Sequence, residues 1–161
     1  RLMADALSPV ATLAALPLTR KDRRPGQGSD ETNVSRALGL TRLGASYFVV
    51  RPGEAAFPYH VHYGEDELIY IVEGEGTYRF GDASYAVKAG DMLGAPAGGL
   101  DRAHQLTNTG TTPLRYFCVS DLPPVNVGDL PEVGELVINV RNPDGTQSRP
   151  TLRFPRPENA R

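Results

Sequence analysis

Residues 60–80 read HVHYGEDELIYIVEGEGTYRF, and this stretch carries the strongest structural signal in the chain. Within it, Leu68 to Val72 is an apolar run rich in β-branched residues, which favours a β-strand. Gly74 to Gly76 predicts a turn, and Thr77 to Phe80 returns as a second strand. The stretch therefore predicts two paired strands that are preceded directly by histidines and carboxylates.

Short predicted strands continue on both sides of this stretch. Upstream, Leu43 to Val50 is rich in strand-forming residues and ends at the turn Arg51-Pro52-Gly53. Downstream, we expect strands over four short segments, Ser84–Val87, Met92–Ala95, Gln105–Asn108 and Arg115–Val119. The 17 glycines and 14 prolines would break a helical bundle, but they suit many tight turns. We therefore predict an all-β fold, a small sandwich or barrel.

Composition excludes several classes of protein. The length of 161 residues fits one domain, and the net charge of -2 argues against a nucleic-acid surface, which needs a basic excess. No apolar run is long enough for a membrane-spanning helix. The segment from Leu2 to Leu18 is a poor signal-peptide core, because Asp5 and two prolines interrupt it. Cys118 is the only cysteine, which rules out an intramolecular disulfide and favours a cytoplasmic location.

The two ends of the chain differ from its middle. Residues 1–40 are expected to form an N-terminal arm, because Thr19 to Asn33 is charged, contains glycine and lacks an apolar period, as a loop does. The barrel is expected over 41–122. Beyond it, 123–161 is predicted to be a C-terminal extension that packs on the barrel.

A terminal hairpin is predicted within this extension. Leu136 to Val140 and Thr151 to Phe154 read as strands, and Asn142-Pro143-Asp144-Gly145 lies between them as a turn.

The histidines form the most informative chemical pattern. His60 and His62 are two residues apart, so in a strand they project to the same face. Glu67 opens the next strand and shares its face with Ile69 and Ile71, while His104 begins another predicted strand. A single histidine on a strand is usually an ordinary polar residue. Imidazoles and a carboxylate above an apolar floor, however, suit a divalent metal.

These residues also resemble the two sequence motifs of the cupin superfamily. The first motif is carried by Pro52-Gly53, His60-Val61-His62, Glu67 and Gly74, and the second by Gly90-Asp91, Pro96-Ala97-Gly98, His104 and Asn108. The resemblance covers about Leu43 to Val119. It implies a double-stranded β-helix, also called a jelly-roll barrel, and a metal site whose ligands are His60, His62, Glu67 and His104.

One departure from the motifs lies directly before the last ligand. Five residues, Gly99 to Ala103, separate the second motif's Pro-x-Gly from His104, where the family usually has two. Either His104 is displaced, or the longer loop lines the mouth of the site. We favour the second alternative because the spacing from His104 to Asn108 is intact. Arg102 in this loop is a candidate catalytic residue that would face an anionic substrate group; the alternative is a surface arginine paired with Asp101.

Other polar residues are harder to place. Four could line the cavity, although the turns leave their faces open: Tyr78, Arg79, Tyr85 and Lys88. Glu65 and Asp66 are expected to be solvated, although one could replace a ligand if the strand register shifts. Asn108 is expected to hold its strand end through side-chain hydrogen bonds.

The ligand set leaves the metal open among Zn, Fe, Mn, Ni and Co. A thiolate site is excluded because Cys118 is alone. Because ligands must be deprotonated, we expect metal loss as the pH falls through the ordinary imidazole range, about pH 6.

The resemblance implies a small-molecule substrate, and a metal-dependent isomerase of a sugar or sugar phosphate is the favoured function. The alternatives are an iron dioxygenase and a non-catalytic binder or sensor. Glu67 counts against the cupin dioxygenases that act on thiols, which generally lack this residue. We also expect a homodimer paired through edge strands and arms.

Overall fold

The computed structural model describes residues 9–144, 146–148 and 150–157, and it is built almost entirely of antiparallel strands. The strands are β1 (Thr19–Arg24), β2 (Gln27–Asn33), β3 (Leu43–Val50), β4 (Val61–His62), β5 (Glu67–Glu73), β6 (Glu75–Phe80), β7 (Ala83–Lys88), β8 (Met92–Ala95), β9 (His104–Thr107), β10 (Leu114–Asp121), β11 (Val125–Leu130), β12 (Glu135–Val140) and β13 (Leu152–Pro155). One short α-helix, α1 (Val34–Leu38), and two 3-10 turns, η1 (Leu13–Ala15) and η2 (Leu100–Arg102), connect them. Among the described residues, no helix has the length and apolar character that crossing a membrane requires.

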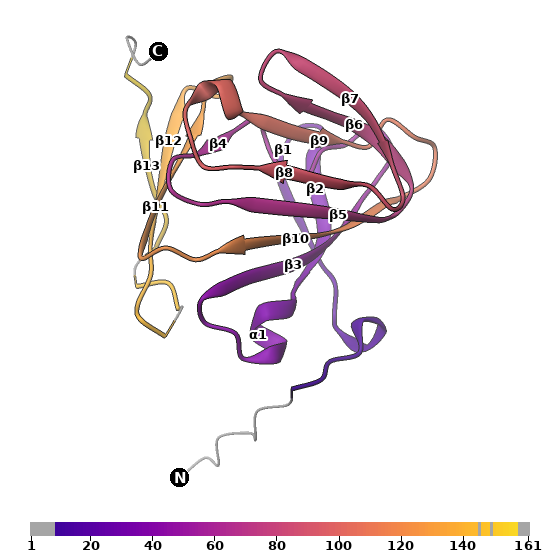
Figure 1. The fold of residues 1–161 in the computed structure, drawn as a ribbon, viewed down its shortest axis with the longest axis horizontal. Helices are drawn as coiled ribbons and strands as arrows, with labels where there is room; N and C mark the ends of the chain where they lie inside the picture. Colours follow the sequence, from indigo (N-terminus) through magenta and orange to yellow (C-terminus); the bar gives the residue numbers. More distant parts are fainter. Residues whose placement is uncertain (1–8, 145, 149, 158–161) are drawn as a thin grey trace.

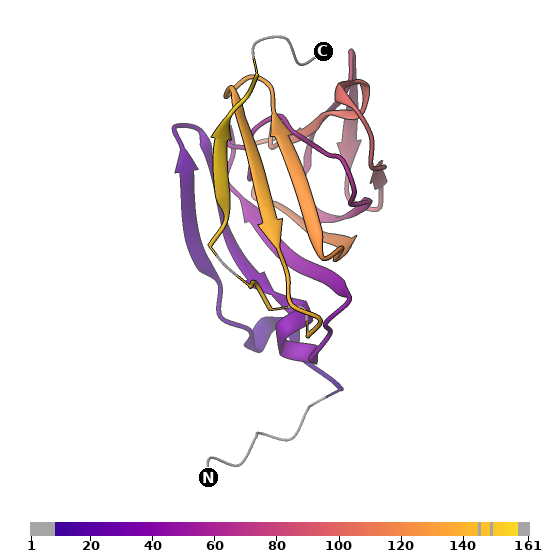
Figure 2. The same cartoon turned by 90° about the vertical axis from the view of Figure 1, so that its left-hand side faces the viewer.

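The strands form three sheets (Figures 1 and 2). The first has the order β1-β2-β3-β10-β5-β8, the second β13-β12-β11-β4, and the third β7-β6-β9. Apolar side chains from the first and third sheets meet in the centre, and they include Phe48, Val50, Ile69, Ile71, Tyr78, Leu106, Leu114 and Tyr116. This arrangement confirms the predicted all-β jelly-roll fold.

The N-terminal segment departs from the prediction. The prediction of a loop over Thr19 to Asn33 is wrong, because β1 and β2 pair in an antiparallel hairpin. β2 also pairs with β3 and so extends the sheet. The hairpin lacks an apolar period because its partly buried side carries ion pairs instead. Arg23 donates to Glu31 at 2.6 Å and to Ser29 at 3.1 Å. The signal for these strands is therefore charge pairing, which a search for apolar alternation does not register.

The C-terminal segment contains the predicted hairpin, since β12 pairs with β13 in antiparallel register. Gly145 of the predicted turn lies outside the described residues. β11 also pairs with β4, so that Gly128 lies opposite His62. The C-terminal segment thus shares a sheet with the strand that carries one of the predicted ligands. The division of the chain at 40/41 and 122/123 stays a prediction.

Candidate metal centre

Two backbone pairings hold the histidine pair in place. His60 exchanges backbone hydrogen bonds with His104, at 3.0 Å and 2.7 Å, and this links the segment before β4 to the start of β9. Between the two histidines, Val61 points the opposite way and is buried. The alternation of a strand therefore directs the imidazoles of His60 and His62 to one side, as their spacing predicted.

The carboxylate of Glu67 lies close to the imidazoles of all three histidines. Oε2 of Glu67 lies 3.0 Å from Nε2 of His104, 3.6 Å from Nε2 of His62 and 3.9 Å from Nε2 of His60. Ligand atoms of His60, His62 and Glu67 lie within 4.8 Å of one another, close enough to hold one metal ion. The structure therefore brings the four predicted ligands together. His104 donates a hydrogen bond to the carboxylate, and its role as fourth ligand stays a proposal.

The longer loop before His104 does not displace this histidine. The loop forms η2, whose Leu100 packs with the buried cluster of Tyr59, Val61 and Ala103. The prediction that this loop lines the mouth of the site is wrong. Residues 99–103 do not belong to the lining of the large cavity next to the cluster. The apolar side chains of Leu100 and Ala103 favour burial behind the histidine pair instead.

Arg102 belongs to the same loop, but its side chain is exposed. Its guanidinium donates to the carbonyl oxygen of Ala97 at 2.9 Å and lies 4.0 Å from Asp101, and its side chain is 45% exposed. This geometry matches the alternative of a surface arginine beside Asp101. A catalytic role for Arg102 remains an untested prediction, and the function proposed below does not use it.

The electrostatic state of the cluster suits a cation. Burial and the neighbouring His104 lower the pKa of His60 to about 3, so its imidazole is neutral near pH 7. Burial alone would raise the pKa of Glu67, but the hydrogen bond from His104 and the nearby imidazoles outweigh it and lower this pKa to about 2. A neutral imidazole next to an ionised carboxylate is the state in which both groups bind divalent metals.

Hydrogen bonds on the far side of the rings orient two of the histidines. The carbonyl oxygen of Pro58 can only accept, so Nδ1 of His60 donates to it at 2.8 Å and leaves the lone pair of Nε2 facing Glu67. Nδ1 of His62 lies 2.9 Å from the side-chain amide of Asn126, which is fully buried on β11. The C-terminal segment thus contributes to the position of a candidate ligand.

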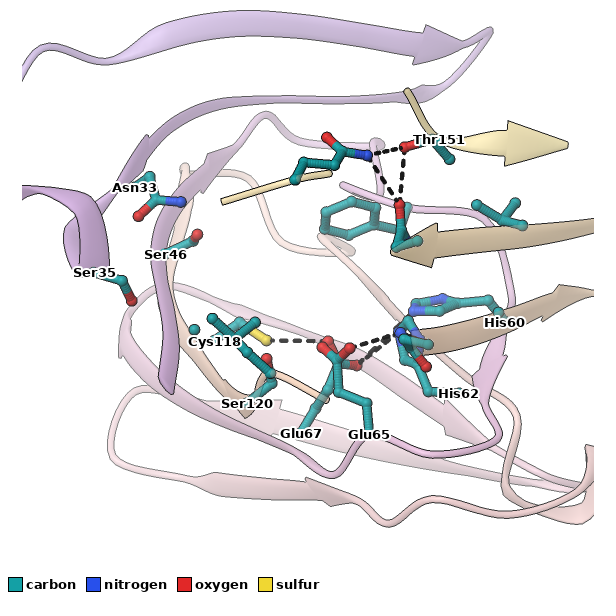
Figure 3. Close-up of a pocket in the computed structure, with 18 of the residues that line it drawn as sticks. Asn33, Ser35, Ser46, His60, His62, Glu65, Glu67, Cys118, Ser120 and Thr151 are labelled. Carbon is teal, nitrogen blue, oxygen red and sulfur yellow. Dashed lines mark hydrogen bonds and ion pairs between the residues drawn. The ribbon is translucent and has the colours of Figure 1, made fainter. Parts of the chain in front are cut away.

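Three residues near the cluster were missed or misjudged from the sequence. Glu65, expected to be solvated, is only 6% exposed, and Asn126 donates to it at 2.6 Å. Cys118 donates to the other oxygen of Glu67 at 3.5 Å, and burial raises the pKa of its thiol, which therefore stays protonated. Figure 3 shows Glu65 and Glu67 both directed toward the histidines, with Cys118 on the side of Glu67 that is away from them. Asp66 is exposed as predicted.

The reason for the error at Glu65 is that its partner lies far away in the sequence. Asn126 reaches it only because β11 pairs with β4. The only local signal was the position of Glu65 two residues before Glu67, which gives both the same parity. By contrast, Asn108 holds its strand end as predicted, by donating to the carbonyl oxygens of Val50 and Thr112.

The cluster opens into a cavity of about 1350 Å³, to whose lining all three sheets contribute, the third through β9. Phe48, Ile69 and Tyr116 form part of its apolar wall, whereas Ser46 and Thr151 contribute hydroxyl groups (Figure 3).

The four residues whose faces the sequence left open lie outside this lining, in the part of the chain that the structure describes. Tyr78 is buried in the core and donates to the carbonyl oxygen of Gly94, and Arg79 stacks over the ring of Tyr59. Tyr85 and Lys88 are exposed.

Comparison with known proteins supports the class of protein that this fold and cluster define, a β-barrel with a candidate metal centre. Residues 46–120 match the family model described as the cupin domain. A sugar phosphate isomerase from Silicibacter pomeroyi superposes with a TM-score of 0.76 at 18% identity, over 91% of this chain and 92% of that one. A Thermotoga maritima protein described as a predicted oxalate decarboxylase superposes with a TM-score of 0.61 at 24% identity, over 71% and 99%. Residues 46–120 thus form a cupin domain, and the chain as a whole has the cupin fold.

Similarity in sequence to curated relatives is confined to a shorter region. An oxalate-binding protein of Thermotoga maritima is 37% identical over 60 residues, which cover 37% of this chain and 47% of that protein. The chain thus spans about half the length of the curated relatives it matches.

Proposed function

We propose that this cupin is a metal-dependent enzyme that acts on a small oxygenated substrate, and that it isomerises a sugar or sugar phosphate. The observation that carries the proposal is the position of the cluster, whose candidate ligands face a cavity large enough for a small molecule and lined in part by polar groups. The likeness of fold to a sugar phosphate isomerase over nine tenths of both chains supports the choice of reaction.

The residues of the cluster fit a divalent ion, because neutral imidazoles and one carboxylate suit Zn, Fe, Mn, Ni or Co. His60, His62 and Glu67 would hold the ion, with His104 as the proposed fourth ligand. Once bound, such an ion polarises a carbonyl oxygen of the substrate. The hydrogen bond from His60 to Pro58 keeps the ligating nitrogen directed at the cluster.

Isomerisation also needs a group that moves a proton between neighbouring carbon or oxygen atoms of the substrate. Glu65 is the carboxylate of the cavity that lies beside the cluster without belonging to the candidate ligand set. Asn126 fixes one of its oxygens by a hydrogen bond at 2.6 Å. We assign proton transfer to Glu65 within the proposed reaction.

The test is conversion of aldose and ketose phosphates by chelated protein reloaded with each candidate metal in turn. We expect interconversion with at least one metal, and loss of at least about 100-fold in His62→Ala. Lys88→Ala, a change at an exposed residue outside the cavity lining, should leave the rate unchanged. Oxygen consumption by the iron-loaded protein without isomerisation would overturn the proposal and favour the dioxygenase.

A second candidate function, non-catalytic binding of a small molecule, is favoured by the relative described as an oxalate-binding protein. Titration calorimetry of the metal-loaded protein with oxalate distinguishes the two functions. Tight oxalate binding that disappears in His62→Ala, together with no turnover of any sugar phosphate, would favour the binder.

A further inference from the structure

The charged side chains of the cavity are of two kinds. Four acidic residues line the cavity: Glu65 and Glu67 at the histidine cluster, and Glu135 and Asp144 on the C-terminal segment. Five arginines line it as well, and they are Arg23, Arg24, Arg36, Arg141 and Arg153. Arg23 and Arg24 belong to β1, Arg36 to α1, Arg153 to β13, and Arg141 follows directly after β12. The cavity therefore combines an acidic, imidazole-rich site with a separate set of guanidinium groups.

Three of these arginines already have carboxylate partners. Arg23 pairs with Glu31 at 2.6 Å, while Arg24 and Arg153 both pair with Glu135, at 3.1 Å and 2.8 Å. In the part of the chain that the structure describes, the guanidinium groups of Arg36 and Arg141 form no hydrogen bond or ion pair. These two positive charges are thus available to a ligand of the cavity.

Arg141 is the more constrained of the two. It is half-buried directly after β12, and its backbone is held on one side by Pro124 and on the other by a bridge to Gln147. Its charge lowers the pKa of the Glu65 carboxyl, although burial outweighs this effect and raises that pKa. A half-buried guanidinium has given up part of its hydration, and an oxyanion that binds two of its N–H groups restores those interactions.

Arg36 lies on α1, at the same end of the molecule as the loop that follows β12 (Figures 1 and 2). Figure 3 shows Asn33 and Ser46 on this side of the cavity, away from His60 and His62. The hydroxyl of Ser46 lines the cavity, and the amide of Asn33 caps α1 through its oxygen, which leaves its NH2 group as a donor. Neutral donors thus accompany the unpaired charge.

We propose that Arg141 and Arg36 form a subsite for a phosphate group of the substrate, at the end of the cavity where α1 and the loop after β12 lie. The inference rests on the proposed function and names its substrate class, a phosphorylated sugar rather than a free one. Two guanidinium groups match the double charge of a phosphate monoester, and each can bind two phosphate oxygens. The reacting carbonyl end of such a substrate then reaches the imidazole cluster.

The experiment is calorimetric titration of inorganic phosphate into the metal-loaded protein and into His62→Ala. We expect binding in both, because the subsite does not include the metal. Arg141→Gln and Arg36→Gln should each weaken phosphate binding about 10- to 100-fold, the usual effect of losing a hydrogen-bonded charge. Arg141→Lys should recover only part of the affinity, because lysine keeps the charge without the paired donors.

Arg42→Gln is the matched control, since Arg42 is an exposed arginine outside the cavity lining, and its phosphate affinity should equal that of the wild type. Equal phosphate binding by wild type, Arg141→Gln and Arg36→Gln would overturn the inference. So would binding of acetate in preference to phosphate, because the subsite would then be one for carboxylates.

The outcome also separates this inference from the proposed function. Phosphate binding that depends on Arg141, in a protein without isomerase activity, would support the subsite and contradict the isomerase. If isomerase activity is found, Arg141→Gln should raise the KM for the phosphorylated sugar while leaving that for the free sugar unchanged. An equal change for both sugars would count against the subsite and leave the isomerase intact.

Discussion

At the scale of single residues, the cluster depends on Glu67, because one oxygen of its carboxylate faces Nε2 of three histidines. An ionised carboxylate in such a buried position needs donors or cations around it. His104 and Cys118 supply hydrogen bonds, and a divalent ion would supply the remaining positive charge. Loss of a ligand should therefore appear in metal affinity before it appears in folding.

We expect His62→Ala and Glu67→Gln to lower metal affinity by more than about 100-fold, because changes in groups that only orient ligands already cost 10- to 100-fold. Both variants should remain folded, since the core is made of apolar strands. Metal analysis after dialysis, together with circular dichroism, measures the two effects. Asp66→Asn is the control, because Asp66 is exposed and lies beside Glu67 without reaching the cluster. Outright unfolding of His62→Ala would indicate a structural ion.

The pH dependence of the metal-free protein should follow His60. Burial lowers the pKa of His60 from its ordinary 6.5 to about 3, so between these values the unfolded chain binds a proton that the folded chain does not. Stability should therefore fall as the pH decreases from 6.5 to 3, by up to about 1.4 kcal/mol per pH unit for this proton. In the metal-free protein, His60 should therefore take up its proton well below about pH 6, the range in which an ordinary imidazole is protonated.

Urea unfolding of metal-free wild type and His60→Gln at several pH values tests this expectation. The variant lacks the titrating imidazole, so its stability should change less with pH over this range. The same slope for both proteins would show that His60 is not responsible.

At the scale of elements, the strands over residues 43–119 could be predicted, because short segments rich in strand-forming residues alternate there with turn signals. Parity within those strands also placed His60, His62 and Glu67 on one side. The hairpin β1–β2 could not be predicted in this way, because the side chains on its inner side are polar. They are Arg23, Ser29 and Glu31, which bind one another. The contact of Asn126 with His62 could not be predicted either, because it depends on the pairing of β11 with β4, far apart in sequence.

The stability of the hairpin β1–β2 should depend on Glu31. Its side chain is 10% exposed and binds Lys21, Arg23 and Ser29. Burial by itself would raise the pKa of Glu31, but these hydrogen bonds outweigh it and lower the pKa below 4.5. Glu31→Gln should therefore cost about 2 kcal/mol at pH 7.

The cost of Glu31→Gln should shrink as the pH falls below 4.5, because a carboxylate with a lowered pKa stabilises the fold above its unfolded pKa and loses that effect as it takes up a proton. Urea unfolding at pH 7 and pH 3 gives both values. Glu73→Gln is the matched control, since its ion pair with Arg115 is exposed and should contribute less than about 1 kcal/mol. If the difference in the free energy of unfolding between wild type and Glu31→Gln is the same at both pH values, the charge of Glu31 is not its cause.

At the scale of the whole molecule, the first sheet ends in β1 and β8, and both edges are open to pairing in the part of the chain that the structure describes. Open edges are commonly covered by another chain, so we retain the expectation of a homodimer. Light scattering coupled to gel filtration should give twice the chain mass. A monomer at all concentrations tested would contradict this expectation.

The C-terminal segment is fastened to the barrel at Asp129, a fully buried carboxylate on β11. It accepts hydrogen bonds from Arg156 at 2.9 Å and from Tyr63, just beyond β4, at 2.8 Å. A buried charge with such partners is costly to disrupt, so Asp129→Ala should lower the free energy of unfolding by about 3 to 5 kcal/mol. Because β4 also carries His62, the variant should bind metal more weakly as well.

Urea unfolding and metal titration of Asp129→Ala measure these two effects in the same protein. Arg153→Gln, which breaks the exposed pair with Glu135, is the control and should cost less than about 1 kcal/mol. If Asp129→Ala unfolds more easily but binds metal with unchanged affinity, the C-terminal segment stabilises the barrel without positioning His62. Weaker metal binding would instead show that residues outside the cupin motifs help to build the metal centre.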